Sequence, residues 1–265
     1  MIHENTLSIH FLSEGRGAQV ILLHGMAASH HDWDQLIPPL VKAGYHAFAP
    51  DLFGHGDSPK PNDPQQYRFD ALYAHLAAWL AGLNLEQPPV FIGHSLGGFL
   101  SLKYALDHPQ SVRGLVLVNP FYAHNQISSW LRLLNRQPRL GAQALRLTPQ
   151  RIIRSIASLE PTSRRYFPPQ TRSRKAADYK RASPHILHIP HTVPDIGADL
   201  PALQLPTLVI WGEKDLTLRP DSFPRLVKAL PHACGYPVQW CGHQPHMGAP
   251  EVVNRVVLEF LESNK

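Results

Sequence analysis

The residues Gly93-His94-Ser95-Leu96-Gly97-Gly98 constrain the local backbone more tightly than any other stretch of this sequence. They follow a short apolar run, Pro89 to Ile92, that predicts a buried strand, and they precede a helix-forming run from Phe99 to Asp107. Gly-x-Ser-x-Gly between a strand and a helix is typical of a turn so tight that the serine hydroxyl projects above the sheet. Side chains at positions 93 and 97 would collide with the neighbouring backbone. Ser95 is therefore the first candidate for a functional residue.

Strand-like and helix-like segments alternate over most of the chain. Continuous apolar runs predict strands at Val20–Leu23, Ala47–Pro50, Pro89–Ile92, Leu115–Val118, Leu208–Trp211 and Val238–Trp240. Helical patterns cover Trp33–Lys42, Phe69–Leu80, Phe99–Asp107, Ser222–Leu230 and Glu251–Leu261. This alternation predicts an α/β fold: a mostly parallel, twisted sheet of about eight strands, with helices on both faces. The segment Leu7–Leu12 predicts an antiparallel first strand.

The alternation stops between the fourth and fifth apolar runs, where the chain is rich in Arg and Pro. Thr148-Pro149 is a helix start, because a capping residue precedes proline at the first helical position. The apolar residues that follow share one helical face. We therefore predict an α/β core built from residues 1–120 and 201–265, with residues 121–200 inserted as a mostly helical, Arg-rich lid.

Composition narrows the class of protein. The 265 residues are enough for one large domain, and no apolar run approaches the roughly 20 residues that a membrane-spanning helix requires. Cys234 and Cys241 make no disulfide framework, which favours a reducing compartment. Residues 1–10 lack the basic-then-apolar pattern of a signal peptide. We expect a cytoplasmic protein without stable membrane insertion.

Two later loops supply the partners that a nucleophilic serine needs. A serine hydroxyl reacts only when a histidine takes its proton, and a carboxylate orients that histidine. Asp215 follows the predicted strand Leu208–Trp211, and His243 follows Val238–Trp240. The carboxyl ends of parallel strands share one edge of a sheet, so Ser95, Asp215 and His243 are expected to meet there. We expect the backbone N–H groups of Met26 and Leu96, on the loops after two strands, to hold an oxyanion.

The sequence resembles an α/β-hydrolase with a lid, of the broad group that contains carboxylesterases, C–C bond hydrolases and cofactor-free haloperoxidases. The residues that carry the resemblance are His24-Gly25, Asp51 to Ser58, Gly93 to Gly98, Trp211 to Asp215, Gly242-His243 and Pro250-Glu251. The resemblance implies a Ser95–His243–Asp215 triad with a Met26/Leu96 oxyanion hole. It also sets two variants aside, since relatives that dehalogenate haloalkanes or open epoxides carry aspartate at the nucleophile position.

What the resemblance implies is a serine hydrolase that cleaves a carboxylic ester and needs no cofactor or metal. C–C hydrolysis of a vinylogous diketone is the first alternative, because the same Ser–His pair serves it. A lyase, a perhydrolase or a ligand receptor built on the hydrolase fold also stays open.

Several side chains near these motifs are weaker candidates. Phe121 and Trp130 are expected either to line a substrate pocket or to form lid core. His246 is a local rival to His243 and is expected to line the pocket or cover the site. His94 and His24 are expected to be buried, hydrogen-bonded supports. The histidines at 185, 188 and 191 are spaced for a metal, but flanking prolines and the lack of acidic ligands argue against one.

The charge distribution is uneven. Residues 120–200 contain 13 Lys/Arg and 4 Asp/Glu, and the rest of the chain is mildly acidic. Arginines on a solvated lid surface would explain this. An anionic partner at the lid, such as an acidic acyl carrier protein or a substrate carboxylate, is the sharper interpretation. An anionic lipid surface ranks third, and nucleic acid is disfavoured because aromatic residues are sparse between the arginines.

Overall fold

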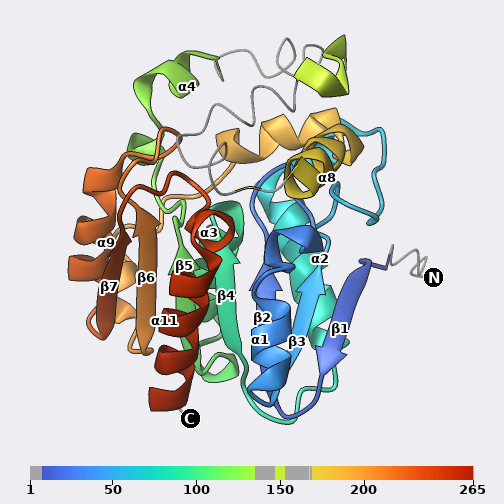
Figure 1. Ribbon diagram of the computed structural model, residues 1–265. Helices are drawn as coiled ribbons and strands as arrows, with labels where there is room; N and C mark the ends of the chain where they lie inside the picture. The colour runs from blue at the N-terminus through green and yellow to red at the C-terminus, as the bar shows by residue number, and fades with distance from the viewer. Residues whose placement is uncertain (1–7, 135–146, 153–166, 168, 265) are drawn as a thin grey trace.

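The computed structural model describes residues 8–134, 147–152, 167 and 169–264, and it confirms the predicted α/β fold (Figure 1). The strands are β1 (Phe11–Gly15), β2 (Ala18–Leu23), β3 (Tyr45–Pro50), β4 (Val90–His94), β5 (Gly114–Val118), β6 (Thr207–Gly212) and β7 (Ala233–Val238). They form one sheet in the order β1-β3-β2-β4-β5-β6-β7. β1 pairs antiparallel with β3, and every other neighbouring pair is parallel. The described residues thus give seven strands rather than about eight.

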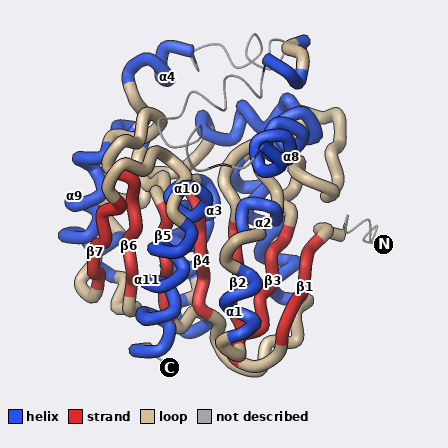
Figure 2. Tube along the Cα trace, viewed as in Figure 1, coloured by secondary structure: helices blue, strands red, loops and turns tan. Residues whose placement is uncertain are grey.

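Helices cover both faces of this sheet (Figure 2). The α-helices are α1 (Ile37–Lys42), α2 (Phe69–Ala81), α3 (Leu96–Asp107), α4 (Ser129–Leu134), α8 (Pro169–Arg181), α9 (Phe223–Ala229), α10 (Pro245–Gly248) and α11 (Pro250–Ser263). The 3-10 helices are η1 (His30–Trp33), η2 (Pro64–Tyr67), η3 (Pro109–Ser111), η4 (His124–Gln126), η5 (Pro184–His191), η6 (Leu200–Ala202) and η7 (Pro220–Ser222). No helix within the described ranges combines the length and apolar character needed to cross a membrane.

The core splits into two layers because successive strand residues point to opposite faces. In β5, Leu115 and Leu117 join a cluster with α2, α3 and α9, whereas Val116 and Val118 join a cluster with α1 and α11. Figure 1 shows α1 and α11 in front of the sheet. Strands buried on both faces read as continuous apolar runs, which is why the sequence pattern located them.

Three predicted boundaries were wrong. The predicted helix Trp33–Lys42 is divided into η1 and α1, since the prolines of Ile37-Pro38-Pro39 are compatible only with the first turn of a helix. The last strand spans 233–238 rather than 238–240. It lies at the sheet edge and tolerates Pro237 there, and it ends before Trp240, which has a φ of 65°. The first strand begins at Phe11 rather than near Leu7, and Leu7 lies outside the described residues.

Helices α4 and α8 lie beyond the carboxyl ends of the parallel strands (Figure 1). Residues 150–152 are helical, and the other residues of the predicted apolar face after Thr148 lie outside the described residues. Arg174 of α8 forms an ion pair with Asp34, and Arg181 of the same helix forms one with Asp57. Part of the positive charge of the inserted segment therefore faces acidic residues of the core. About half of the predicted basic residues lie outside the described ranges, at positions 136, 139, 146, 154, 164 and 165.

Candidate active site

Ser95 occupies the turn between β4 and α3, with φ 50° and ψ −110°. A positive φ is strained for any residue other than glycine. The turn is closed by contacts that leave no room for side chains. A Cβ at Gly97 would lie 2.0 Å from the carbonyl oxygen of Leu23, and one at Gly93 would lie 2.5 Å from that of Gly97. Both glycines are therefore required, as the motif predicted.

The structure brings Ser95, His243 and Asp215 together. The Nε2 atom of His243 lies 3.1 Å from Ser95 Oγ, and its Nδ1 lies 2.8 Å from Asp215 Oδ2. The side chain of Asp215 is fully buried on the loop after β6, and that of His243 is 15% exposed on the loop after β7. Three different strand ends thus place a hydroxyl, an imidazole and a carboxylate in one line of hydrogen bonds.

Asp215 is held as a carboxylate. Burial raises its pKa, but the charge of His243 and hydrogen bonds from His243, the Leu218 N–H and Asn119 outweigh burial, so the pKa lies below its ordinary value. Asn119 donates from Nδ2 to Asp215 Oδ2 over 2.7 Å, and the N–H groups of Thr217 and Leu218 donate to Oδ1. The sequence pattern missed the role of Asn119. A polar residue directly after β5, at the shared strand edge, was the available signal.

The N–H groups of Met26 and Leu96 were predicted to form an oxyanion hole. Leu96 is the first residue of α3, so its N–H has no acceptor within the helix. Met26 belongs to the loop after β2, called here the Gly25 loop (residues 24–28). This loop contains Ala27 at a φ of 60°, a strained conformation for a residue with a side chain. No ligand marks the position of an oxyanion, so the roles of Met26 and Leu96 stay predictions.

His24 braces the Gly25 loop, in agreement with its predicted role. Its Nδ1 donates to the Gly25 carbonyl oxygen over 2.7 Å, and its Nε2 accepts from the Leu52 N–H over 2.9 Å. One nitrogen donates and the other accepts, so the ring is neutral. Burial lowers the pKa of His24, even though Asp51 and Asp32 act in the opposite direction. The loop is thereby tied to Leu52, the second residue after β3.

His94, beside Ser95 in the chain, is also a buried support. Its Nδ1 lies 3.1 Å from Asp32 Oδ2, and its Nε2 lies 3.0 Å from the carbonyl oxygen of His243. Asp32 also accepts from the Gly25 N–H at 3.3 Å. A Cβ at Gly25 would lie 2.7 Å from His94 Nδ1, so this approach requires glycine. The contribution of Asp32 was not predicted from the sequence.

The predicted pocket residues are placed as follows. Phe121 is buried against Phe99, and its N–H donates to the Ser95 carbonyl oxygen. Trp130 belongs to α4, and its side chain lies outside what the structure describes. His246 is 1% exposed, between the rings of Trp33 and His94, so it lies in the core behind the site. Pocket contact by these residues stays a prediction.

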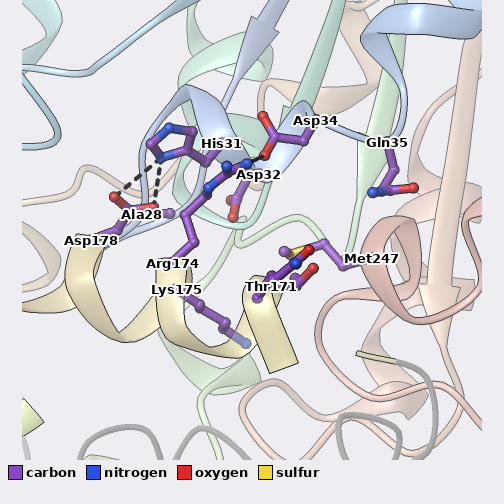
Figure 3. A pocket seen from close by; sticks show the side chains of 11 residues that line it. Ala28, His31, Asp32, Asp34, Gln35, Thr171, Arg174, Lys175, Asp178 and Met247 are labelled. Carbon is purple, nitrogen blue, oxygen red and sulfur yellow. Dashed lines mark hydrogen bonds and ion pairs between the residues drawn. The ribbon is translucent and has the colours of Figure 1, made fainter. Parts of the chain in front are cut away.

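A cavity of about 400 Å³, called here the α8 cavity, is lined in part by Asp32, the partner of His94 (Figure 3). Its wall mixes polar and apolar surface and is contributed by the Gly25 loop, η1 and its following turn, α8 and α10. The lining residues are Ala28, His31, Asp32, Asp34, Gln35, Gln170, Thr171, Arg174, Lys175, Asp178 and Met247. Figure 3 shows His31 joined to Asp178 and Arg174 joined to Asp34. Lys175 is buried and hydrogen-bonds Gln244, near His243.

Two groups of potential metal ligands occur in the described part of the chain. They are His10 with His30 and Asp51, and Asp32 with His94 and His246. In both groups the carboxylate already accepts hydrogen bonds from histidine. We assign no metal to either group. The histidines at 185, 188 and 191 lie in or at the end of η5 and belong to neither group.

Comparison with known proteins identifies the family. The model of the alpha/beta hydrolase fold family matches residues 19–250, which is most of the chain. The chain belongs to the alpha/beta hydrolase fold family. Its observed sheet order, strand–turn–helix at Ser95 and helices on both faces agree with that membership. Family membership establishes the fold and leaves the reaction and the substrate open.

Individual alpha/beta hydrolases similar to this chain carry several activities in their names. Bifunctional epoxide hydrolase 2 from Sus scrofa is 25% identical over 97% of this chain and 53% of its own length. The chain thus spans about half the length of the first curated relatives it matches. A 2-hydroxy-6-oxononadienedioate/2-hydroxy-6-oxononatrienedioate hydrolase from Pseudomonas putida is 27% identical over 98% of this chain and 93% of its own length. A Thermogutta terrifontis esterase structure has a TM-score of 0.82 at 24% identity, over 96% of this chain and 93% of that one.

Proposed function

We propose that this alpha/beta hydrolase cleaves a carboxylic ester through an acyl-enzyme formed on Ser95. The observation that carries the proposal is the line of hydrogen bonds from Ser95 Oγ through His243 to Asp215. The order of the three in the chain, Ser, Asp, His, matches the order found for this arrangement in the fold.

The geometry supports a two-step reaction. His243 Nε2 takes the proton of Ser95 as Oγ attacks the ester carbonyl carbon, and buried Asp215 stabilises the resulting imidazolium. The N–H groups of Met26 and Leu96 hold the negative oxygen of the tetrahedral intermediate. His243 then gives its proton to the departing alcohol. Water, deprotonated by His243, attacks the acyl-Ser95 ester, His243 returns the proton to Ser95 Oγ, and the acid is released.

The serine at position 95 favours an ester over an alkyl halide or an epoxide, although relatives named haloalkane dehalogenase and epoxide hydrolase match the chain. Attack of a serine oxygen on an alkyl carbon would leave an ether. An ether has no carbonyl carbon for water to attack, so the enzyme would not turn over. Attack on an acyl carbon leaves an ester, which the same site can hydrolyse.

Hydrolysis of a C–C bond in a diketone-type substrate is the second candidate. The relative from Pseudomonas putida matches almost end to end, and its name describes hydrolysis of 2-hydroxy-6-oxo diacids. The Ser–His pair would serve that reaction as well. A variant of the first candidate is an ester whose acyl group is carried by an acidic protein. The exposed Arg132 and Arg151 of the inserted segment would favour docking of such a protein.

The decisive experiment is hydrolysis of p-nitrophenyl esters, from acetate to long acyl chains, by wild type, Ser95→Ala and Ser111→Ala. Ser111 is exposed after α3 and serves as the matched control. We expect Ser95→Ala to lower kcat/KM by about 10³-fold or more, and Ser111→Ala to leave it unchanged. The acyl chain length that gives the highest kcat/KM would indicate the length of the acyl pocket.

Full activity in Ser95→Ala would refute the acyl-enzyme. A folded wild type that hydrolyses no ester would refute the general esterase and favour C–C hydrolysis or a carrier-bound ester. With a carrier-bound ester, a rate that falls steeply with salt would support the basic segment as its docking surface.

A further inference from the structure

Among the described residues, the buried Asp32–His94 pair has no role in the proposed reaction. Asp32 and His94 have side chains 4% and 3% exposed, and they meet directly behind the Ser95–His243 pair. Replacing such a pair by apolar residues often leaves the free energy of unfolding unchanged or raises it. The presence of the pair therefore indicates a role other than stability. The atoms that the pair touches indicate one.

Both ring nitrogens of His94 face acceptors. A backbone carbonyl only accepts, so Nε2 must carry a hydrogen to bond the His243 oxygen at 3.0 Å. Burial raises the pKa of Asp32, but hydrogen bonding and the charge of His94 hold it well below its ordinary value, so Asp32 is a carboxylate. A carboxylate also only accepts, so Nδ1 must carry a hydrogen too. His94 is thus held between two acceptors, Asp32 on one side and the His243 backbone on the other.

The two ends of the pair contact two loops that the proposed reaction needs in a fixed relative position: the Gly25 loop and the loop that carries His243. Asp32 accepts from the N–H of Gly25, the residue before Met26. His94 donates to the backbone of His243 itself, and the two imidazole rings lie 5.0 Å apart. One continuous set of hydrogen bonds therefore runs from the Gly25 loop, through Asp32 and His94, to the loop that carries His243.

We propose that Asp32 and His94 are positioning residues: they fix the His243 backbone relative to Ser95 and to the Met26 N–H. This inference rests on the proposed function of Ser95 and His243. Both residues act through the Gly25 loop and the His243 loop, which they join by hydrogen bonds. Errors of about 1 Å in such a geometry can lower the rate about 100-fold, so a buried pair that sets it has a measurable effect on kcat.

Two substitutions at His94 separate its two hydrogen bonds. The amide nitrogen of asparagine takes approximately the place of Nδ1, so His94→Asn keeps the bond to Asp32 and loses the bond to His243. The amide nitrogen of glutamine reaches approximately to Nε2, so His94→Gln keeps the bond to His243. His55→Asn is the matched control, because His55 is equally buried and bonds the Phe53 carbonyl oxygen.

On a p-nitrophenyl ester, we expect His94→Asn to lower kcat at least about tenfold with KM within about twofold. We expect His94→Gln to keep kcat within about threefold of wild type. The rate of Ser95 labelling by a fluorophosphonate, which requires no ester turnover, should follow the same order. A role in stability alone would lower Tm in both variants and in His55→Asn, without this split between Asn and Gln.

The outcomes distinguish this inference from the proposed function. Full activity in Ser95→Ala would refute the proposed function. An inactive Ser95→Ala combined with equal kcat in His94→Asn and His55→Asn overturns the positioning role alone. If His94→Asn does not fold, Asp32→Asn carries the test, since its amide has the same shape. Its kcat should then fall at least about fivefold, and a kcat equal to that of His55→Asn overturns the proposal.

Metal analysis of the purified wild type is a separate arm. About one equivalent of a transition metal, lost in His246→Gln, would mean that His94 Nδ1 carries a lone pair for the ion instead of a hydrogen. That result would overturn the proposal that His94 joins Asp32 to the His243 loop by hydrogen bonds. Absence of bound metal together with the Asn–Gln split in kcat would support it.

Discussion

Asn119 shows how one neutral side chain can organise the acid of the site. It is fully buried at a φ of 41°, directly after β5. Its Nδ2 donates to Asp215, and its Oδ1 accepts from the Gly212 N–H at 3.2 Å. Asn119 therefore fixes the carboxylate from one side and the backbone before it from the other.

Replacing Asn119 by alanine should reduce both stability and kcat. The substitution leaves Asp215 Oδ2 with one donor fewer and leaves the Gly212 N–H unsatisfied, which costs about 1–3 kcal/mol of unfolding free energy. We expect kcat on a nitrophenyl ester to fall about tenfold with KM nearly unchanged. Urea unfolding and steady-state kinetics check this. Asn264→Ala, at the end of α11, removes one side-chain hydrogen bond far from the site and should leave kcat unchanged.

At the scale of elements, the turn from β4 to α3 is the most crowded junction near the site. Gly97 lies against the end of β2, and Gly98 lies against Pro120, where an added Cβ would approach the proline side chain to 2.7 Å. The start of α3 can therefore approach the sheet only with glycine at both positions. The position of Ser95 above the strand ends depends on this approach.

Gly97→Ala should be strongly destabilising, by about 3 kcal/mol or more, because the clash is with backbone that cannot move aside. Gly82→Ala is the matched control. Gly82 has ordinary helical backbone angles, and its Cβ would meet nothing closer than 3.4 Å. Alanine there should be neutral or slightly stabilising. Chemical denaturation of the two variants compares them directly, and equal stability would contradict the crowding described.

Local patterns predicted the elements where the local signal decides the structure. The buried strands were found because their residues are apolar on both faces. β7 was misplaced because Ala-Cys-Gly-Tyr-Pro carries no apolar run, and its pairing with β6 comes from the sheet and not from its own residues. The prolines at the start of α1 were interpreted as part of a longer helix that began at Trp33. They fit only the first turn of a helix, so α1 begins at Ile37.

The candidate site divides in the same way. Ser95 and Asp215 were predictable because each follows a recognisable strand within a motif, and His243 because it lies in the Gly242-His243 motif, although the strand before it was misplaced. Asn119 and Asp32 were not, because their partners lie 96 and 62 residues away and no motif links them. His246 was expected to line the pocket or cover the site, which stays a prediction, and its packing against Trp33 depends on how α10 packs on η1.

At the scale of the whole molecule, buried histidines set the response to acid. Burial lowers the pKa of His24, His55 and His246, and that of His55 falls to about 3. The unfolded chain takes up a proton on each near pH 6.5, whereas the folded chain does not. The free energy of unfolding therefore falls as the pH drops below about 6.5. His30 acts in the opposite direction, because its hydrogen bond to Asp51 raises its pKa.

Denaturant unfolding at pH 7.5 and pH 5.0 should show this loss. His55 alone contributes about 1.4 kcal/mol per pH unit, or about 2 kcal/mol over the interval below pH 6.5. The pKa values of Asp32, Asp51 and Asp215 are lowered, so their contributions stay constant in this range and are lost only at lower pH. In His55→Asn the difference between the two pH values should shrink by about 2 kcal/mol. An unchanged difference would contradict this account.

Strands β5 and β6 are nearest neighbours in the sheet, although the chain between them runs from residue 119 to residue 206. This long connection leaves and re-enters the sheet at one place, while Ser95, Asp215 and His243 all lie outside it. Much of the α8 cavity wall lies inside it. Sequence changes beyond Asn119 in this connection can therefore alter the wall of the α8 cavity while leaving Ser95, Asp215 and His243 themselves unchanged.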